Sequence, residues 1–358
     1  MSHDFHPLRV VEVIRETPDA VSIRLEPSAS DAGKFAFKAG QHLTIRRVFN
    51  GEEVRRNYSV CASPREGVLR IGVKKIAGGV FSTWANDDIR PGDTLDAMAP
   101  HGSFTWVFEP NAARAYAAFA GGSGITPILS LIKTALETEP QSRFTLCYGN
   151  RTSAGIMFLE ELAGLKDRYL DRLSLLHFLE DEEEEIALFN GRLDRAKIDE
   201  VLDSLIAPDA IDAFFICGPG PMMDAAEAAL RARDVAKSKI LIERFTTAEL
   251  SAAQAAAARA LEEKAAGLKM SVTLNGRKVN VTFDPANKSI LDNVRAAGLP
   301  APFACKGGVC ATCRAKVTSG TVEMKVNYGL SAEEVAEGYV LTCQATPVSE
   351  GVALSYDL

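Results

Sequence analysis

Four cysteines near the end of the 358-residue chain have a spacing that can bind iron. The first three are separated by four and then two residues, and the last follows 30 positions after the third: Cys305, Cys310, Cys313 and Cys343. Thiolates in this pattern bind plant-type [2Fe-2S] clusters, which carry one electron at a time. The intervening segment 306–309 contains two glycines, which allow the tight turn that aims N–H groups at sulfur. The spacing therefore predicts such a cluster and one-electron transfer.

Two other uses of these cysteines fit the sequence less well. A structural zinc site usually takes two close pairs of ligands, whereas Cys343 stands alone with no histidine nearby. A disulfide framework is typical of short secreted chains, and this chain has seven cysteines and no secretory signal at its start. We therefore expect a reducing compartment, the cytoplasm.

Two motifs in the N-terminal third suit a flavin dinucleotide. Arg56-Asn57-Tyr58-Ser59 combines a cation for phosphate, an aromatic ring that can stack on a flat cofactor, and a hydroxyl for a ring nitrogen. Gly78-Gly79-Val80-Phe81-Ser82 is a glycine turn that opens an expected helix, whose free N–H groups can bind an anion. Together they predict an FAD site. A surface arginine and an ordinary helix cap are the alternative.

Two glycine-containing loops farther along predict a second nucleotide site. Gly121-Gly122-Ser123-Gly124-Ile125-Thr126-Pro127 lies between an apolar run and an expected helix, where a parallel sheet presents N–H groups to a pyrophosphate. Pro127 stands where the usual dinucleotide fingerprint has a third glycine or alanine. Another turn, Cys217-Gly218-Pro219-Gly220-Pro221, ends a second apolar run. Two such loops can hold one extended dinucleotide.

Short strands must position the flavin motifs. The N-terminal third alternates apolar and polar residues in runs such as Val21–Leu25 and Leu69–Val73, and turn signals such as Pro91-Gly92-Asp93 separate the runs. Many short strands of this kind predict a small antiparallel β-barrel over residues 1–107.

From residue 108 the pattern changes to alternating strands and helices. We expect strands at 116–120, 144–148, 173–178, 213–217 and 240–245, and helices at 128–136, 158–165 and 222–233. This order predicts an α/β domain with a doubly wound parallel sheet over residues 108–246.

The remaining sequence predicts a linker and a third domain. Residues 247–268 are rich in alanine; Thr246 and Glu249 are spaced as a capping box, so we expect a helical, semi-rigid linker that stops at Gly267. In residues 269–358, the pair Asn275-Gly276 between alternating runs predicts a hairpin, and a helix is expected at 289–297. Hairpin, helix and then cysteine loop is the order of an α+β β-grasp ferredoxin domain.

Composition and charge indicate a soluble multi-domain protein. The chain is 47% hydrophobic, enough for two or three cores, and its net charge of −7 argues against nucleic acid as a principal partner. The acidic run Glu180–Glu185 predicts a solvated loop, with docking to a basic partner as the alternative. The uncharged stretch Ala115–Ile132 contains glycines and Pro127, which indicates a strand, a turn and a helix rather than a membrane span.

The order of these motifs resembles the ferredoxin-NADP reductase superfamily, and more narrowly the reductase components of bacterial oxygenases that carry a C-terminal ferredoxin domain. Several segments resemble the reductase subunits of phenylacetyl-CoA epoxidases: Ala304–Cys313, Val326-Asn327-Tyr328, Gly338–Ala345, Tyr148–Thr152 and Glu243-Arg244-Phe245. The resemblance covers essentially the whole chain except the alanine-rich segment.

The resemblance implies roles for the flavin residues. Arg56 and Ser82 would hold the FAD pyrophosphate beside the Gly78-Gly79-Val80 turn. Tyr58 would stack on the flavin ring, and Ser59 would hydrogen-bond near flavin N5. By the same resemblance, Phe245 would close over the flavin region.

The resemblance also implies roles for the nicotinamide residues. The residues expected to seat the dinucleotide are Gly122, Ser123, Gly124, Thr126 and Gly218. Cys217 would approach the nicotinamide ring, so Cys217 and Ser59 are the expected catalytic residues. The alternative for Cys217 is a small buried side chain at a strand end, which is also how we interpret Cys61 and Cys147.

Arg151 bears on the choice of nicotinamide. It follows an expected strand, where the family places cations for the 2′-phosphate, so the resemblance favours NADPH over NADH. An exposed arginine at a strand end is the alternative.

Electron counting implies the order of the redox centres and a partner. A nicotinamide gives two electrons as hydride and a [2Fe-2S] cluster accepts one, so FAD, which can do both, must lie between them. No oxygen-activating site is expected here, because the five histidines are scattered and no Glu-x-x-His pair exists for a diiron centre. The resemblance implies that electrons go to a separate diiron oxygenase, phenylacetyl-CoA epoxidase. Two alternatives stay open: the reductase of an aromatic-ring or steroid hydroxylase, and a non-enzymatic iron-sulfur sensor or adaptor that binds no nicotinamide.

Overall fold

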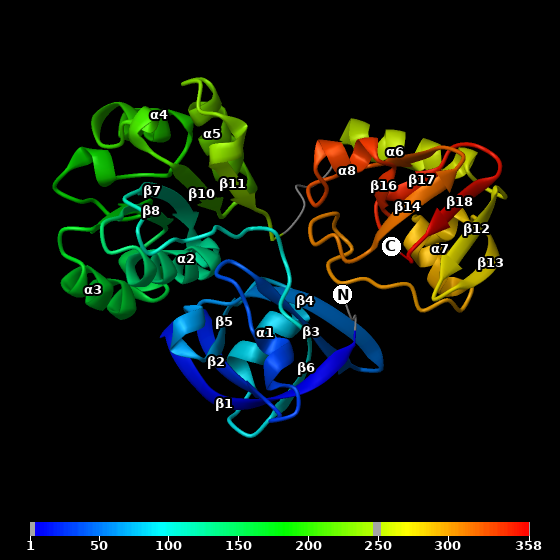
Figure 1. The fold of residues 1–358 in the computed structure, drawn as a ribbon, viewed down its shortest axis with the longest axis horizontal. Coiled ribbons are helices and arrows are strands. Elements are labelled where there is room, and N and C mark those ends of the chain that lie inside the picture. The colour runs from blue at the N-terminus through cyan, green and yellow to red at the C-terminus, as the bar shows by residue number, and fades with distance from the viewer. Residues whose placement is uncertain (1–3, 246–251, 358) are drawn as a thin grey trace. The chain divides into compact units, whose positions relative to one another are not determined.

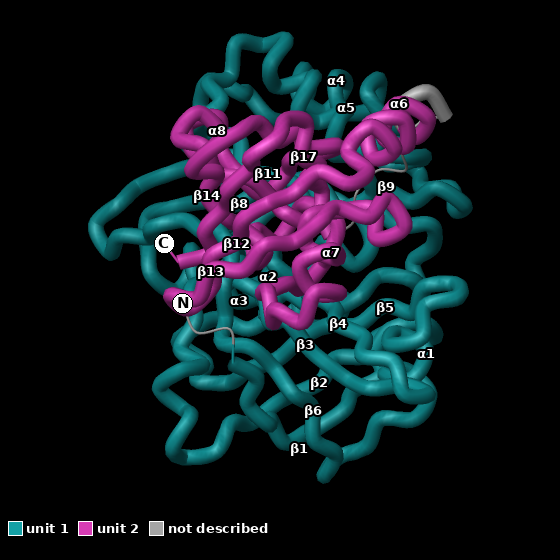
Figure 2. The backbone as a smooth tube through the Cα atoms, turned by 90° about the vertical axis from the view of Figure 1, so that its right-hand side faces the viewer, with its two compact units in different colours: residues 1–243 teal, residues 244–358 magenta. Residues whose placement is uncertain are grey.

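The chain in the computed structural model divides between Glu243 and Arg244 into two units, drawn in different colours in Figure 2. The structure describes residues 4–245 and 252–357. Unit 1 ends at Glu243, three residues before the predicted end of the nicotinamide domain, and unit 2 holds the cysteine loop (Figure 1).

The N-terminal part of unit 1 is the expected antiparallel barrel, in the strand order β4-β3-β6-β1-β2-β5. Inward-facing side chains such as Leu8, Ile23 and Ile71 are fully buried and form its core. The helix α1 (Val80–Asp87) follows β5. The strands are β1 (Phe5–Thr17), β2 (Ala20–Pro27), β3 (His42–Phe49), β4 (Glu52–Ser59), β5 (Leu69–Lys74) and β6 (Thr94–Met98).

The second part of unit 1 is a five-stranded parallel sheet in the order β11-β10-β7-β8-β9, which confirms the predicted doubly wound domain. Figure 1 shows α4 and α5 on one side of the sheet and α2 and α3 on the other. The strands are β7 (Ala115–Gly121), β8 (Arg143–Asn150), β9 (Leu173–Leu179), β10 (Ala213–Cys217) and β11 (Ile240–Glu243). The helices are α2 (Ile125–Thr138), α3 (Leu159–Arg168), α4 (Arg195–Ser204) and α5 (Gly220–Arg231).

Unit 2 is a small α+β domain. Its main sheet has the order β13-β12-β18-β14-β16, and β15 pairs with β17. Asn275 and Gly276 have φ values of +53° and +71°, the left-handed conformations of a two-residue hairpin turn, so the predicted hairpin is confirmed. The strands are β12 (Lys269–Leu274), β13 (Arg277–Thr282), β14 (Arg314–Ser319), β15 (Val322–Met324), β16 (Tyr339–Leu341), β17 (Ala345–Pro347) and β18 (Val352–Ser355). The helices are α6 (Ala252–Lys264), α7 (Ile290–Ala296) and α8 (Ala332–Ala336).

The end of the alanine-rich segment is anchored in unit 2. Glu262 of α6 forms an ion pair with Lys325, and Ala265 is buried in the hydrophobic core of this unit. Thr246 and Glu249, the predicted capping box, lie outside the described residues. The described part of the helix is therefore attached to the ferredoxin-like unit at its C-terminal end.

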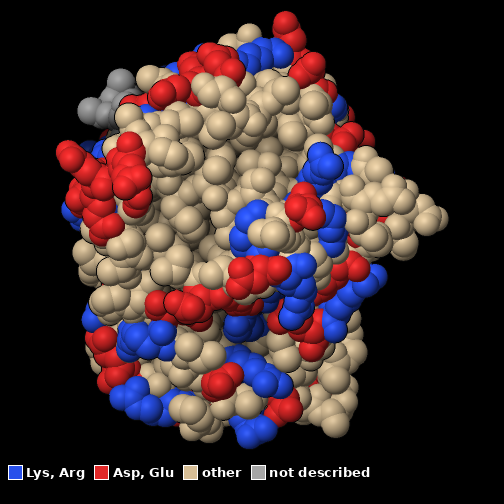
Figure 3. Space-filling view, turned by 90° about the vertical axis from the view of Figure 1, so that its left-hand side faces the viewer, with Lys and Arg blue, Asp and Glu red and all other residues tan. Residues whose placement is uncertain are grey.

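Charged side chains of both signs lie interspersed on the face of the molecule drawn in Figure 3. The run Glu180–Glu185 follows β9 as an irregular loop whose side chains are mostly exposed, as predicted. Among the helices in the described residues, none has the length and apolarity that crossing a membrane requires.

Candidate functional site

The four cysteines of the predicted cluster site lie as two pairs. The Cys305 amide donates to Cys310 Sγ at 3.5 Å, and the amide of Thr342, the neighbour of Cys343, donates to the Cys313 carbonyl at 3.2 Å. The Gln344 side-chain amide donates to the Lys306 carbonyl at 2.8 Å and to Cys343 Sγ at 3.9 Å, so the loop of the first pair and Cys343 of the second face one site. In the part of the chain that the structure describes, no three His, Cys, Asp or Glu side chains form a group that could hold a single metal ion. Two pairs fit a two-iron cluster, in which each iron takes two cysteines.

The backbone of the cysteine loop directs donors toward sulfur. Lys306, Gly308 and Ala311 have φ values of +52°, +75° and +53°. Such left-handed conformations cost energy for lysine and alanine, so the surrounding fold must hold them in place. The Gly307 amide donates a hydrogen bond to Cys305 Sγ at 3.2 Å. Amide donors stabilise thiolate charge, and this donor set therefore fits an iron-sulfur cluster.

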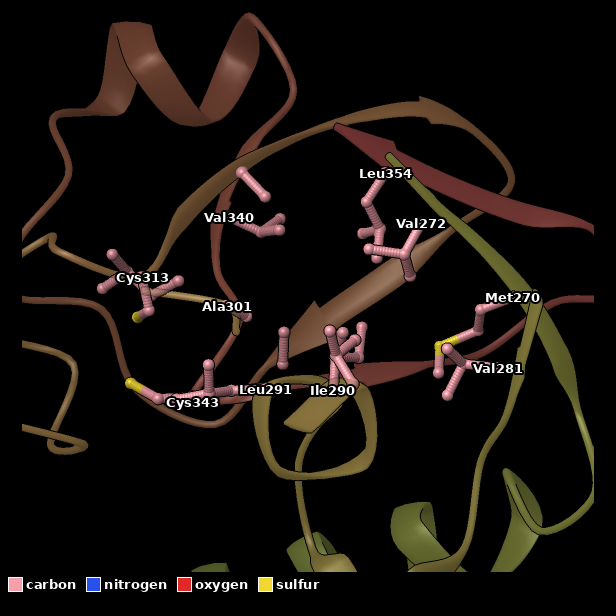
Figure 4. Packing of buried hydrophobic residues seen from close by; sticks show 14 of the residues in the cluster. Met270, Val272, Val281, Ile290, Leu291, Ala301, Cys313, Val340, Cys343 and Leu354 are labelled. Atoms are coloured by element: carbon pink, nitrogen blue, oxygen red, sulfur yellow. The ribbon is translucent and has the colours of Figure 1, made fainter. Parts of the chain in front are cut away.

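The second cysteine pair is anchored in the core of unit 2. Cys313 and Cys343 are 3% and 7% exposed, and Figure 4 shows their sulfur atoms at the same end of the core, beside Ala301. The Tyr356 hydroxyl donates to Thr342 Oγ1 at 2.8 Å, and the Thr342 hydroxyl donates to the Cys313 carbonyl at 2.8 Å. Because Thr342 directly precedes Cys343, this chain of hydrogen bonds fixes the backbone at both predicted ligands.

The predicted flavin residues lie on β4, which pairs with β3. In this antiparallel ladder Leu43 lies opposite Tyr58, and His42 lies opposite Ser59. The Tyr58 ring contacts Phe81 of α1 with centroids 5.3 Å apart, and burial raises the pKa of its hydroxyl. Ser59 is 2% exposed, and its Oγ has no hydrogen-bond partner among the described residues. A buried hydroxyl without a partner is costly, so this atom fits the predicted hydrogen bond to a flavin.

The Gly78-Gly79 turn leads directly into α1. Gly78 has a φ of +71°, and a Cβ on Gly79 would lie 2.5 Å from Ser82 Oγ. The Ser82 hydroxyl donates to the Gly79 carbonyl at 3.2 Å and accepts from the Ile76 amide at 3.1 Å. Ser82 therefore closes the turn, and its contact with a pyrophosphate, like that of Val80, stays a prediction.

The two loops of the predicted nicotinamide site pack against each other. Because β7 and β10 are neighbours in the parallel sheet, the loops that follow them lie at the same edge. A Cβ on Gly124 would lie 2.0 Å from the Cys217 carbonyl oxygen, and one on Gly218 would lie 2.8 Å from the Gly121 nitrogen. Only glycine permits these close approaches.

The first of these loops is held from both sides. The short 3₁₀ turn η3 (Gly122–Gly124) leads into α2, and the Thr126 hydroxyl donates to the Ser123 carbonyl at 3.0 Å. The Tyr148 hydroxyl donates to the Gly122 carbonyl at 2.9 Å. The loop and the N-terminal end of α2 are thus fixed, as a dinucleotide site requires.

Two polar residues to which the sequence analysis gives no site role lie beside the predicted catalytic pair. Glu243 lies opposite Cys217 in the parallel ladder, and its Oε1 is 3.6 Å from Nδ1 of His42, which lies opposite Ser59. Burial, and then the charge of Glu243, raise the pKa of Cys217, which is therefore a neutral thiol. The register that joins these residues is visible only in the folded sheets. Phe245 is half-buried in unit 2, so its closure over the flavin stays a prediction.

The two arginines predicted to bind phosphate lie near strand ends. Arg56 of β4 is exposed and donates to the Arg55 carbonyl at 2.7 Å. Arg151 follows β8, is 79% exposed, and lies 2.8 Å from the Asp181 carboxylate. A phosphate at Arg151 would therefore share this cation with Asp181.

Family models match three successive parts of the chain. Residues 7–106 match the oxidoreductase FAD-binding domain, residues 119–228 the oxidoreductase NAD-binding domain, and residues 272–348 the 2Fe-2S iron-sulfur cluster binding domain. These matches agree with the three sites described above.

Known proteins resemble the chain over its whole length. It is 44% identical over 355 residues to a 1,2-phenylacetyl-CoA epoxidase subunit of Escherichia coli (strain K12), covering 99% of this chain and 98% of that protein. It is 35% identical over 359 residues to the 3-ketosteroid-9-alpha-monooxygenase, ferredoxin reductase component, of Mycobacterium tuberculosis (strain ATCC 25618 / H37Rv), covering 98% and 95%. The solved structure of phthalate dioxygenase reductase has a TM-score of 0.61 at 22% identity, covers 98% of both chains, and shows the fold.

Proposed function

The chain belongs to the ferredoxin reductase family, as an oxidoreductase and reductase component of multicomponent oxygenases, and from this membership we propose that it carries electrons from NADPH to phenylacetyl-CoA epoxidase. The observation that supports this most is the 44% identity to the Escherichia coli protein over 99% of the chain. A cytoplasmic location, where cysteines stay reduced, fits the same proposal.

Three groups of residues would hold the cofactors. Tyr58 and Ser59 would hold the flavin ring, with Arg56 and the start of α1 toward its pyrophosphate. The loops 121–126 and 217–221 would hold the nicotinamide dinucleotide, and the two cysteine pairs would each bind one iron. FAD, when bound, supplies the conversion of a two-electron donor into a one-electron donor. The protein residues position the groups; Cys217, as a neutral thiol, adds no charge beside the nicotinamide.

The proposed acceptor is a separate diiron oxygenase that acts on phenylacetyl-CoA, so this chain need not contact the substrate. The second candidate is a steroid hydroxylase, because a 3-ketosteroid-9-alpha-monooxygenase reductase is 35% identical over 98% of the chain. The higher identity to the epoxidase protein favours the first candidate. A sensor without nicotinamide is disfavoured by the match of residues 119–228 to an NAD-binding domain.

Reconstitution with purified partners tests the proposal. Anaerobic addition of NADPH to the loaded protein is expected to bleach the flavin and cluster absorption bands, because both centres accept its electrons. With the oxygenase component of phenylacetyl-CoA epoxidase, oxidised product should form; with a 3-ketosteroid hydroxylase it should not. Persistence of both bands contradicts the reductase function. Product formation only with the steroid hydroxylase contradicts the choice of partner.

Arg151→Ala tests the preference for NADPH. Arg151 is the exposed cation after β8, and removing it should raise the KM for NADPH about tenfold and that for NADH less than about twofold, because only NADPH carries a 2′-phosphate. Arg192→Ala is the matched control, since Arg192 is similarly exposed and pairs with Glu180 in the same region. Steady-state kinetics with both nicotinamides give the answer. An equal rise for the two would refute the role of Arg151.

A further inference from the structure

One face of α2 carries polar residues at helical spacing, and each of them contacts the barrel rather than only the domain to which α2 belongs. The residues recur every three or four positions, so they form one stripe along the helix: Thr126, Ser130, Lys133 and Glu137. At the N-terminal end of the stripe, a Cβ on Gly72 of β5 would lie 2.7 Å from Thr126 Cγ2. The barrel thus approaches α2 so closely that only glycine fits there.

Hydrogen bonds continue along the stripe. The Ser130 hydroxyl donates to the Ala62 carbonyl at 2.6 Å. At the other end of the helix, the Ser63 hydroxyl donates to the Glu137 carboxylate at 2.5 Å. Both barrel residues belong to the segment that follows β4, so this segment lies along α2.

The centre of the stripe is a network of four charges around one buried cation, Lys133; the side chains of Arg70, Glu161 and Glu66 are 17%, 25% and 31% exposed. Lys133, whose side chain is 6% exposed, lies 2.9 Å from Glu66 of the barrel and forms an ion pair with Glu161 of α3. Arg70 of β5 binds both oxygens of Glu161 at 2.7 Å. Burial opposes the ionisation of Glu161, but the charges of Arg70 and Lys133 prevail and lower its pKa. Two cations and two anions therefore alternate across the junction of the two domains.

Such a network selects one arrangement of the domains. Contacts between domains of a chain usually allow relative motion. Buried ion pairs add little net stability, since desolvation offsets their attraction, but losing one partner leaves an uncompensated buried charge. Any shift of the nicotinamide domain that separates Lys133 from Glu66, or Glu161 from Arg70, is penalised in this way.

The helix that carries the stripe begins at the glycine loop of the predicted nicotinamide site. We propose that Lys133 is a positioning residue that holds α2 against the barrel and so sets the distance between the nicotinamide and flavin sites. This inference rests on the proposed function. Hydride transfer requires reacting atoms about 3–3.5 Å apart, and a displacement of about 1 Å can cost about 100-fold in rate.

Lys133→Met in the full-length protein tests the proposal. At saturating NADPH, the limiting rate of flavin bleaching in an anaerobic stopped-flow experiment should fall about tenfold. The reason is that the distance between the nicotinamide and flavin sites is no longer fixed. The dissociation constant for NADPH should change less than about twofold, since its binding groups lie within one domain. Lys133→Arg, which keeps the charge, should restore the rate to within about threefold.

Hydrogen exchange supplies a readout that needs no cofactor. In Lys133→Met, amide exchange should rise in α2 and in residues 64–74 of the barrel, which face each other across the network, and stay unchanged in β8 and β9. Lys197→Met is the matched control, because this half-buried lysine pairs with Glu200 inside its own helix. Should Lys133→Met fail to fold, Glu66→Gln removes only the charge on the barrel side and should lower the same rate.

Three results would overturn the proposal: an unchanged limiting rate in Lys133→Met, an equal loss in Lys133→Arg, or a loss confined to KM. If the wild-type flavin is not bleached by either nicotinamide, the proposed function fails instead. In that case hydrogen exchange still decides whether Lys133 holds the two domains together.

Discussion

Replacing Cys310 by serine is expected to stop electron delivery beyond the flavin while the flavin is still reduced by NADPH. Cys310 and Cys305 form one of the two thiol pairs, and losing one thiolate leaves an iron with a single cysteine. The rate at which the oxygenase partner is reduced should fall by at least about 100-fold. Changing a residue that only orients a metal ligand costs up to about 100-fold, and removing a ligand should cost at least as much. Iron content and the visible spectrum report whether the cluster is lost. Anaerobic stopped-flow kinetics report whether NADPH still reduces the flavin and whether electrons reach the oxygenase.

Cys147→Ala is the control for this variant. Cys147 is fully buried in β8 of unit 1, whereas the four predicted ligands belong to unit 2. Iron content should match that of the wild type. A cluster that survives in Cys310→Ser, or one that is lost in Cys147→Ala, would show that other residues hold the iron.

Gly124→Ala is expected to disable the nicotinamide site. The new Cβ would lie 2.0 Å from the Cys217 carbonyl oxygen and 2.7 Å from the Gly218 nitrogen, both backbone atoms that cannot turn aside. The two loops must separate, so kcat/KM for NADPH should fall at least about 100-fold. FAD content should stay at the wild-type level, because the predicted flavin residues lie in the barrel. Steady-state kinetics and the flavin-to-protein ratio report the two effects.

The matched control is Gly164→Ala. Gly164 lies inside α3, where an added Cβ would meet no atom within 4 Å, and alanine is favoured over glycine in a helix by about 1 kcal/mol. Activity should be unchanged and stability slightly higher. Wild-type kinetics in Gly124→Ala would mean that the dinucleotide binds elsewhere.

Features that depend on neighbouring residues can be predicted from sequence. The apolar run Ala213–Cys217 predicts strand β10, and the strand begins and ends at these two residues. The hairpin between β12 and β13 turns at Asn275-Gly276, as these residue types predict. The helix α2 begins three residues earlier than the sequence predicts, at Ile125, because Pro127 lies in the first turn, where no N–H donor is needed. The helix α4 is not predicted, since half of its ten residues are charged and only Ile198, Val201 and Leu202 are buried.

Features that depend on register between distant segments cannot be predicted in this way. Glu243 lies beside Cys217 only because β11 pairs with β10, and His42 faces Ser59 only because β3 pairs with β4. Likewise, Ser130 and Lys133 are residue types of an ordinary exposed helix face, and nothing local shows that the barrel covers them. Motif spacing indicates the predicted cofactor loops, whereas tertiary packing determines which polar residues surround them.

The covalent connection between Glu243 and Arg244 makes electron delivery to the cluster an event within one molecule. Two units on one chain meet at an effective concentration on the order of millimolar, whereas separate proteins meet at their concentration in the cell. Dilution of the protein therefore leaves the passage from flavin to cluster unchanged and slows only the encounter with the oxygenase. The abundance of the oxygenase, rather than that of a free ferredoxin, then governs how fast electrons leave the chain.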